Sequence, residues 1–168
     1  SKGRWSRAIL SLYASLRPKD WEHTDKDVLA GNLFFSTDKP NLHHIFPTNS
    51  AYVLAQQSLN RITSDSLMNI AYLPQITNLD ITNRDPLNYL TDYDKPGFEN
   101  IAVPSHLLPL ELLHWARQGQ LPANAIDLFI EARVDKILDA RRERLPGIQV
   151  SEIATLACRT RGGGSRPQ

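Results

Sequence analysis

The sequence predicts a mostly helical α+β domain in which a short strand–strand–helix unit lies among helices. Residues 41–47, NLHHIFP, have the apolar content of a short strand and end at a proline, which cannot donate to a β-ladder. Residues 70–73, IAYL, indicate a second strand, followed by a turn and a short helix over about residues 75–83. Apolar residues at helical spacing in the flanking segments predict the surrounding helices.

The composition is that of one globular domain. With 168 residues, the chain is long enough to bury a sizeable core. The formal net charge of +1 carries no general signature of nucleic-acid binding, so a DNA-binding surface would have to be a local patch. The single cysteine, Cys158, excludes an intrachain disulfide and fits a reducing cytosol. No apolar run reaches the length of a membrane span, and we therefore expect a cytoplasmic protein without a membrane partner.

Apolar stripes predict four longer helices around the two strands. They cover residues 3–16, 51–59, 105–118 and 122–144, with a bend in the third at Pro109. Pro86 is placed to start a short helix that ends at Leu90. Residues 91–104 are rich in Asp, Pro and Gly, and we expect them to form a loop. Trp21 is expected to anchor the polar segment after the first helix.

The adjacent histidines His43 and His44 are the first candidate site residues. Neighbouring residues on a strand point to opposite faces, so one imidazole can face a metal ion while the other faces an attacking water. Histidine is the usual general base because its pKa lies near neutral pH, and asparagine offers a neutral oxygen to a hard cation. Two adjacent histidines alone are more often ordinary surface or core residues. Together with Pro47, Asn69 and Asn78, they indicate a metal-dependent nuclease site.

Four phrases occur in order along the chain. They are HHIFP at residues 43–47, LMNIAYL at 67–73, TNLDI at 77–81 and DPLNYL at 85–90. These phrases resemble the HNH (ββα-metal, or His-Me finger) endonucleases. Within that superfamily, the match is to the C-terminal nuclease domain of GmrSD/SspE-type modification-dependent restriction and phage-defence proteins. The resemblance implies a ββα-metal HNH motif embedded among helices.

The resemblance also implies a role for each polar residue of the motif. His44 takes the position of the general base that activates water, and His43 that of a metal ligand. Asn69 takes the middle position, whose side chain braces the loop between the strands. Asn78 takes the last position, where the family name has His and many members use Asn as the second metal ligand. One imidazole and one amide oxygen suit Mg²⁺ or Mn²⁺ with several waters better than zinc.

Arg84 follows the helix that carries Asn78, and it is the remaining candidate site residue. Its guanidinium is placed to hold a DNA phosphate or the leaving group. The alternative is a surface salt bridge with Asp80 or Asp85, and the sequence does not choose between these two interpretations.

These observations predict a divalent-metal-dependent DNA endonuclease or nickase. We expect one domain over residues 1–158, with its core motif at 41–90 and a disordered tail at 159–168. The resemblance implies the C-terminal effector domain of a larger antiphage restriction protein, with an N-terminal nucleotide-hydrolysing domain that is absent from this chain. Two alternatives stay open. One is a degenerate HNH domain that binds DNA or a partner domain without cleaving, and the other is an RNA-directed nuclease.

Overall fold

The computed structural model describes residues 2–31, 38–56 and 64–144. Within these ranges the protein is a mostly helical α+β fold with one two-stranded antiparallel sheet, which confirms the predicted fold class. The strands are β1 (Pro40–His44) and β2 (Ile70–Pro74). The helices are α1 (Lys2–Ser15), α2 (Ala51–Ala55), α4 (Gln75–Ile81), α5 (Pro86–Tyr93), α6 (Val103–Ser105), α7 (Leu110–Gln118) and α8 (Ala125–Arg144), with a 3₁₀ turn η2 (Leu67–Asn69) and a π-helical turn η3 (Phe98–Ala102). The expected tail at 159–168 and Cys158 lie outside the described residues.

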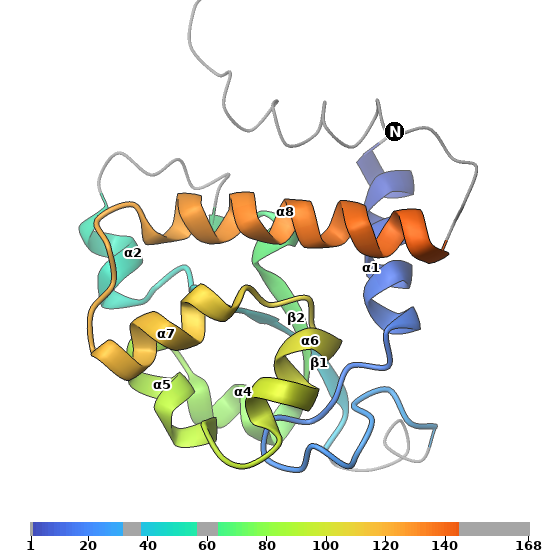
Figure 1. Ribbon diagram of the computed structural model, residues 1–168, viewed down its shortest axis with the longest axis horizontal. Coiled ribbons are helices and arrows are strands. Elements are labelled where there is room, and N and C mark those ends of the chain that lie inside the picture. The colour runs from blue at the N-terminus through green and yellow to red at the C-terminus, as the bar shows by residue number, and fades with distance from the viewer. Residues whose placement is uncertain (1, 32–37, 57–63, 145–168) are drawn as a thin grey trace, which may run out of the picture.

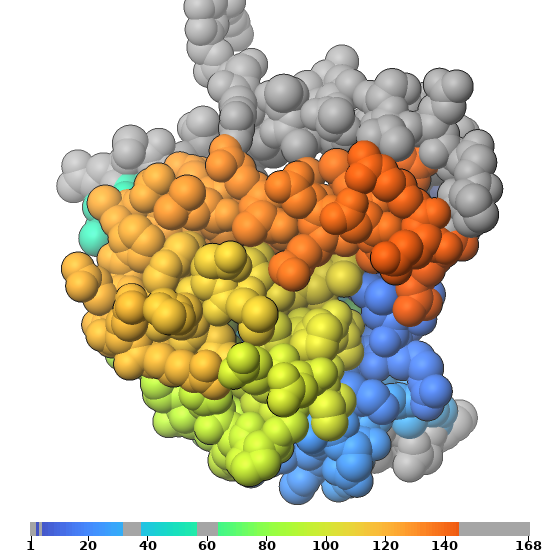
Figure 2. Space-filling model, viewed as in Figure 1, coloured from blue at the N-terminus to red at the C-terminus, as the bar shows by residue number. Residues whose placement is uncertain are grey.

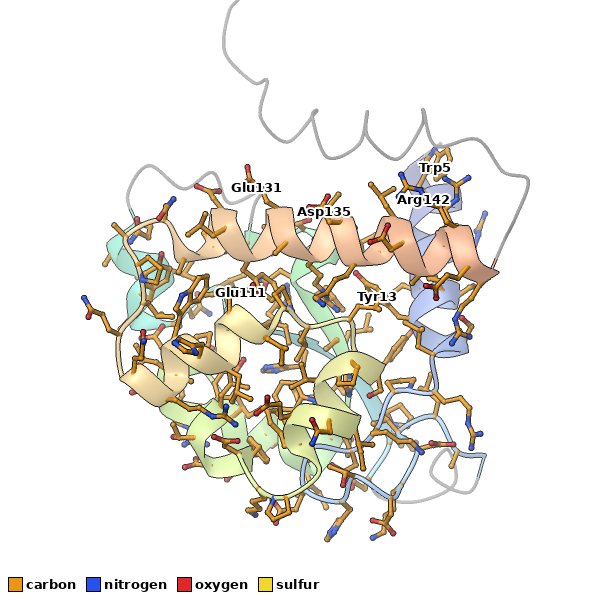
Figure 3. The ribbon with its side chains drawn as sticks, viewed as in Figure 1. Trp5, Tyr13, Glu111, Glu131, Asp135 and Arg142 are labelled. Atoms are coloured by element: carbon orange, nitrogen blue, oxygen red, sulfur yellow. The ribbon has the colours of Figure 1, made fainter. Side chains whose placement is uncertain are left out.

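Helices α1 and α8 form one side of the molecule. In Figure 1, α8 extends along one edge of the fold, α1 lies near its C-terminal end, and α4 to α7 lie below α8 in this view. Ile9 and Tyr13 of α1 pack in one apolar cluster with Ile137 of α8. The space-filling view shows α8 as a continuous band along this face (Figure 2). Figure 3 shows Glu131 and Asp135 on the outer side of α8, so this helix has one polar and one buried face.

The strand–strand–helix unit is formed by β1, β2 and α4. The two strands pair so that His43 lies opposite Ala71 and His44 lies opposite Ile70. Helix α4 begins directly after β2, without the predicted turn, and its first amide, that of Gln75, donates to a backbone carbonyl just before β1 at 2.9 Å. The first strand ends at His44 and does not continue to the proline. The unit therefore carries the histidine pair at the end of its first strand.

Trp21 lies at the centre of the larger core, which confirms its predicted role as an anchor. The indole is 1% exposed and stacks on Tyr89 with ring centroids 6.0 Å apart. Four further rings contact it edge-on or tilted; they belong to His43, Tyr93, Phe98 and His106. This aromatic cluster joins the segment after α1 to β1, α5 and η3. It forms the apolar support on which His43 rests.

The prediction of a loop over residues 91–104 is wrong. Helix α5 continues to Tyr93, and η3 and α6 form much of the remainder. Phe98, Ala102 and Val103 are buried in the larger core, and this burial stabilises helical turns that the Asp, Pro and Gly content argued against. The chain enters η3 through Gly97 at φ 93°, a left-handed conformation that glycine adopts without steric cost.

Two other predicted helices are shorter than expected. Helix α7 starts only at Leu110, because Pro109 has an extended ψ of 135° and no amide hydrogen to donate. Helix α8 starts at Ala125, three residues later than predicted. Of the helix predicted at 51–59, residues 51–55 form α2 and residues 57–59 lie outside the described ranges. None of the described helices combines the length and the apolar content needed to span a membrane.

Candidate active site

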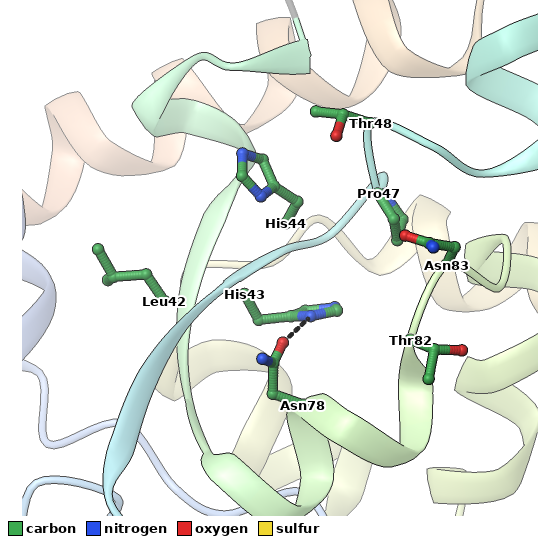
Figure 4. A pocket seen from close by; sticks show the side chains of 8 residues that line it. All are labelled: Leu42, His43, His44, Pro47, Thr48, Asn78, Thr82 and Asn83. Atoms are coloured by element: carbon green, nitrogen blue, oxygen red, sulfur yellow. Dashed lines mark hydrogen bonds between the residues drawn. The ribbon is translucent and has the colours of Figure 1, made fainter.

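A polar pocket of about 160 Å³ lies beside the end of β1. Its lining residues come from β1, the chain after it, and α4 with the turn that follows; they are Leu42, His43, His44, Pro47, Thr48, Asn78, Thr82 and Asn83. In Figure 4, His43 points to the side of β1 that faces α4, whereas His44 points to the other side. Strand alternation therefore gives the two imidazoles different surroundings, and both still line the pocket.

His43 is a buried histidine held by Asn78. The side chain is 2% exposed, and its Nδ1 lies 2.8 Å from Oδ1 of Asn78 on α4 (Figure 4). Because an amide oxygen can only accept, Nδ1 carries the proton of this hydrogen bond. Burial against Trp21 and Tyr89 lowers the pKa of His43 to about 4, and the hydrogen bond to Asn78 offsets only part of that effect. His43 is therefore neutral at pH 7, the state in which imidazole binds metals.

The pair formed by His43 and Asn78 fits a hard, weakly bound cation. Adjacent ligands of an octahedral ion with bonds of about 2.1 Å are about 3 Å apart; the 2.8 Å between these two atoms is a hydrogen bond, whose proton a cation would have to replace. Coordination through Nδ1 would move its proton to Nε2, which is buried and has no hydrogen-bond partner among the described residues. The part of the chain that the structure describes contains no cluster of three or more His, Cys, Asp or Glu side chains that could hold a metal. Water would have to complete the coordination, as Mg²⁺ and Mn²⁺ allow.

His44 is the half-buried partner, and its side chain is 35% exposed. Nε2 lies 3.7 Å from Oδ1 of Asp65, a carboxylate in the segment before η2. Burial lowers the pKa of His44, and the negative charge of Asp65 raises it in part. A neutral imidazole at the pocket edge can accept a proton from water, which is the property that a general base needs.

Asn69 braces the chain after His44. Its Oδ1 accepts from the amide of Phe46 at 2.8 Å, and its Nδ2 donates to the carbonyls of Phe46 at 2.8 Å and Ser64 at 2.7 Å. Its own carbonyl accepts from the amide of Ile45 at 2.8 Å. Asn69 is fully buried, so these bonds form away from competing water. Asn69 therefore fixes the backbone at Phe46, just after β1, and at Ser64, shortly before β2.

Arg84 lies outside the pocket lining. Its Nη1 donates to Asp92 at 2.6 Å, and its Nη2 contacts the carboxylate of Asp80 at 3.4 Å and its carbonyl at 3.3 Å. A salt bridge of Arg84 with Asp80 or Asp85 was the alternative in the sequence analysis. The structure shows the one with Asp80, and the second partner is Asp92 and not Asp85. A role for Arg84 toward a phosphate or leaving group stays a prediction, and it requires these ion pairs to exchange.

Sequence reasoning missed two groups near the site. Thr48 and Asn83 line the pocket, and only the position of Asn83 at the end of the predicted helix hinted at its place. Arg133 of α8 is 1% exposed and donates to the carbonyl of Met68, directly before Asn69, at 2.6 Å. Its spacing could have found it, since residue 133 falls four residues from apolar positions on either side, on the buried face of α8.

Comparison of the chain with known protein families, with curated proteins and with solved structures found no match.

Proposed function

We propose that this protein is a divalent-metal-dependent DNA endonuclease of the HNH, or ββα-metal, type that nicks one strand. The observation that carries the proposal is the arrangement of β1, β2 and α4. Within it, His43 and Asn78 are 2.8 Å apart, and His44 lines the same pocket from the next position on the strand. The order of the HHIFP, LMNIAYL and TNLDI phrases supports the same interpretation.

In the proposed reaction, His44 accepts a proton from a water molecule as the water oxygen attacks phosphorus. The new P–O bond forms as the bond from phosphorus to the leaving sugar oxygen breaks, and the leaving oxygen takes a proton from solvent. A cation held by His43 and Asn78 would stabilise the negative charge on the phosphate and on the leaving oxygen. Asn69 fixes the backbone after His44 and so orients the base. One such site handles one strand, which makes a nick the expected product.

The biological role follows from the resemblance alone. We propose an effector domain of antiphage restriction that acts in the cytoplasm, under the control of an N-terminal nucleotide-hydrolysing domain of the same polypeptide. Mg²⁺ or Mn²⁺ is the cofactor that the donor set favours, since one amide oxygen and one imidazole leave several positions for water.

Nicking of supercoiled plasmid DNA in Mg²⁺ or Mn²⁺ tests the proposal. We expect open-circle product that disappears with EDTA and falls roughly 10²- to 10⁴-fold in His44→Ala. Asn78→Ala should lower cleavage and weaken Mn²⁺ binding together. His114→Ala, which removes an exposed histidine on α7, is the matched control and should cut like the wild type. Undiminished nicking by His44→Ala would exclude this residue as the base.

One observation favours a second candidate, a degenerate domain that binds nucleic acid or a partner domain without cleaving it. His43 is almost fully buried and already hydrogen-bonded to Asn78, an arrangement that also serves as a purely structural polar pair. Wild-type protein that binds oligonucleotide but cuts neither plasmid nor RNA in either cation would favour this candidate. Cleavage of RNA in preference to plasmid would instead indicate the RNA-directed alternative.

A further inference from the structure

Two polar side chains of the pocket have no assigned role. Thr48 lies in the chain after β1, and Asn83 lies in the chain after α4; both line the pocket (Figure 4). Neither side chain forms a hydrogen bond with the residues that the structure describes. A hydroxyl and an amide are both donors. Donors without a protein partner at the wall of a pocket are available to a ligand.

Thr82 has a strained backbone conformation, which turns the chain so that Asn83 reaches the pocket. Thr82 has φ 54° and ψ −121°, a conformation that β-branched residues rarely adopt. Its amide donates to the carbonyl of Asn78 at 3.2 Å, which closes the last turn of α4, and its Oγ1 donates to the carbonyl of Ile81 at 2.7 Å. The chain therefore turns sharply after the helix that carries Asn78. This turn brings Asn83 to the same pocket as Asn78, and strain of this kind tends to persist at functional sites.

Within the described residues, no Lys or Arg lines the pocket. The nearest cation in sequence, Arg84, is held by Asp92 and Asp80. The volume of about 160 Å³ equals roughly five water molecules, which is room for one phosphate group beside a partly hydrated ion. Among the described lining residues, a phosphate in this pocket would therefore meet neutral donors and no guanidinium or ammonium group.

We infer that Asn83 and Thr48 bind the scissile phosphate, by donating from Nδ2 and Oγ1 to its non-bridging oxygens. The inference rests on the proposed function and assigns the phosphate-binding side of the same pocket. A cation held by His43 and Asn78 would supply positive charge, and Asn83 and Thr48 would position the phosphate. Binding of DNA therefore requires the divalent cation.

The test uses Asn83→Ala and Thr48→Val, with Asn88→Ala as the control for an exposed amide on α5. Binding of a fluorescent DNA oligonucleotide is measured by anisotropy in Mn²⁺, in the His44→Ala background so that the DNA stays intact. Mn²⁺ binding is measured separately by electron paramagnetic resonance. We expect each pocket variant to weaken oligonucleotide binding roughly tenfold, the loss of one hydrogen bond to a charged group. Mn²⁺ affinity should not change.

Three outcomes would overturn the inference. The first is oligonucleotide affinity in both pocket variants equal to that of Asn88→Ala, and the second is loss of Mn²⁺ affinity in Asn83→Ala. The third is binding of the oligonucleotide that is as tight in EDTA as in Mn²⁺. Plasmid nicking by the protein with His44 intact keeps the two proposals separate. If that protein nicks and the pocket variants bind DNA normally, the inference fails and the proposed function stands. If it does not nick but the pocket variants lose Mn²⁺-dependent binding, the proposed function fails and the phosphate site stands.

Discussion

Two polar regions flank the end of β1, and they differ in how completely their hydrogen bonds are satisfied. Around Asn69, the amide oxygen and both amide hydrogens have protein partners between 2.7 and 2.8 Å away. In the pocket, Nε2 of His43 has no partner among the described residues, and neither do the side chains of Thr48 and Asn83. The first region is fully buried, whereas the second opens to solvent at His44 and Asn83.

The difference separates residues that hold the fold from residues that meet a ligand. A satisfied buried network stabilises the backbone, and removing one member leaves the others without partners. An unsatisfied polar group at a pocket wall contributes little to stability, and its removal costs binding instead. Substitutions in the Asn69 region should therefore change the free energy of unfolding first, and substitutions in the pocket should change ligand affinity first.

Asn69→Ala should have the largest effect on stability. It leaves the amide and carbonyl of Phe46 and the carbonyl of Ser64 without their partners inside the protein. We expect a loss of at least about 3 kcal/mol in the free energy of unfolding, from three buried groups that each cost about 1–3 kcal/mol when unsatisfied. Urea unfolding followed by circular dichroism measures it. Asn83→Ala is the control from the pocket, and a similar loss in that variant would erase the distinction between the two regions.

Acid should weaken the fold through its buried histidines. His106 donates from Nε2 to the carbonyl of Lys19 at 2.7 Å, and burial lowers its pKa to about 4 from the usual 6.5. The folded protein then binds fewer protons than the unfolded chain. Titration of His106 therefore leaves the free energy of unfolding unchanged above about pH 6.5. The free energy of unfolding decreases as the pH falls from there toward 4, by at most about 1.4 kcal/mol per pH unit. The pKa of His43 is lowered to about 4 as well and adds a slope of the same sign.

His106→Gln tests this pH dependence. Urea midpoints at pH 7.5, 6 and 5 should fall less steeply in the variant than in the wild type, by up to the slope of one proton. His114→Gln, which removes an exposed histidine from α7, is the control for loss of an imidazole. Equal slopes in His106→Gln and the wild type would show that folding does not lower the pKa of His106, contrary to what its burial implies.

The strain at Thr82 gives a smaller effect, which appears when two substitutions are compared. Thr82→Ala and Thr82→Gly both remove the hydroxyl, but only glycine accepts φ 54° and ψ −121° without strain. We expect Thr82→Gly to be more stable than Thr82→Ala by about 1 kcal/mol, the reverse of their usual order. Thermal unfolding by calorimetry measures the difference. If alanine is the more stable of the two, the turn after α4 is not strained.

Arg84→Ala should change stability least, by under about 1 kcal/mol, because its ion pairs with Asp80 and Asp92 are largely exposed. Its effect on nicking tests the predicted role toward a phosphate or leaving group. Arg117→Ala is the matched control, since Arg117 also pairs with two carboxylates on the surface but lies outside the pocket lining. Equal nicking by the two variants would leave Arg84 with a surface salt bridge only.

The sequence predicts those parts of the fold that depend on short-range patterns. The apolar spacing along α1 and α8 and the run IAYL of β2 are visible without the structure, because their burial follows the helix or strand period. The segment at 91–104 is not visible in this way. Its helical turns depend on contacts of Phe98 and Val103 with a core assembled from distant segments, and local composition does not report such contacts.

The candidate site likewise has features that the sequence shows and features that only the structure shows. The sequence singles out His43, Asn69 and Asn78 through the order of the motif phrases, whereas the hydrogen bond between His43 and Asn78 is seen only in the structure. The place of Asn83 depends on one unusual backbone angle at Thr82, and the burial of Arg133 depends on a carbonyl 65 residues away, that of Met68. The turn at Thr82 has no local signature, since a threonine after a helix is common. The spacing of Arg133 between Phe129 and Ile137 indicates the buried face of α8, but not which carbonyl it binds.

The contacts that support the site have a consequence for the timing of folding. The brace between Phe46 and Asn69 spans 23 residues, the hydroxyl of Tyr89 donates to the carbonyl of Ile45 across 44, and Arg133 reaches Met68 across 65. Long loops must close before such contacts form, so we expect them late in folding. On the ribosome, the last of them must await the emergence of α8. A chain that is incomplete or misfolded therefore lacks the assembled pocket, so any activity of this site would begin only when synthesis of the domain is nearly finished.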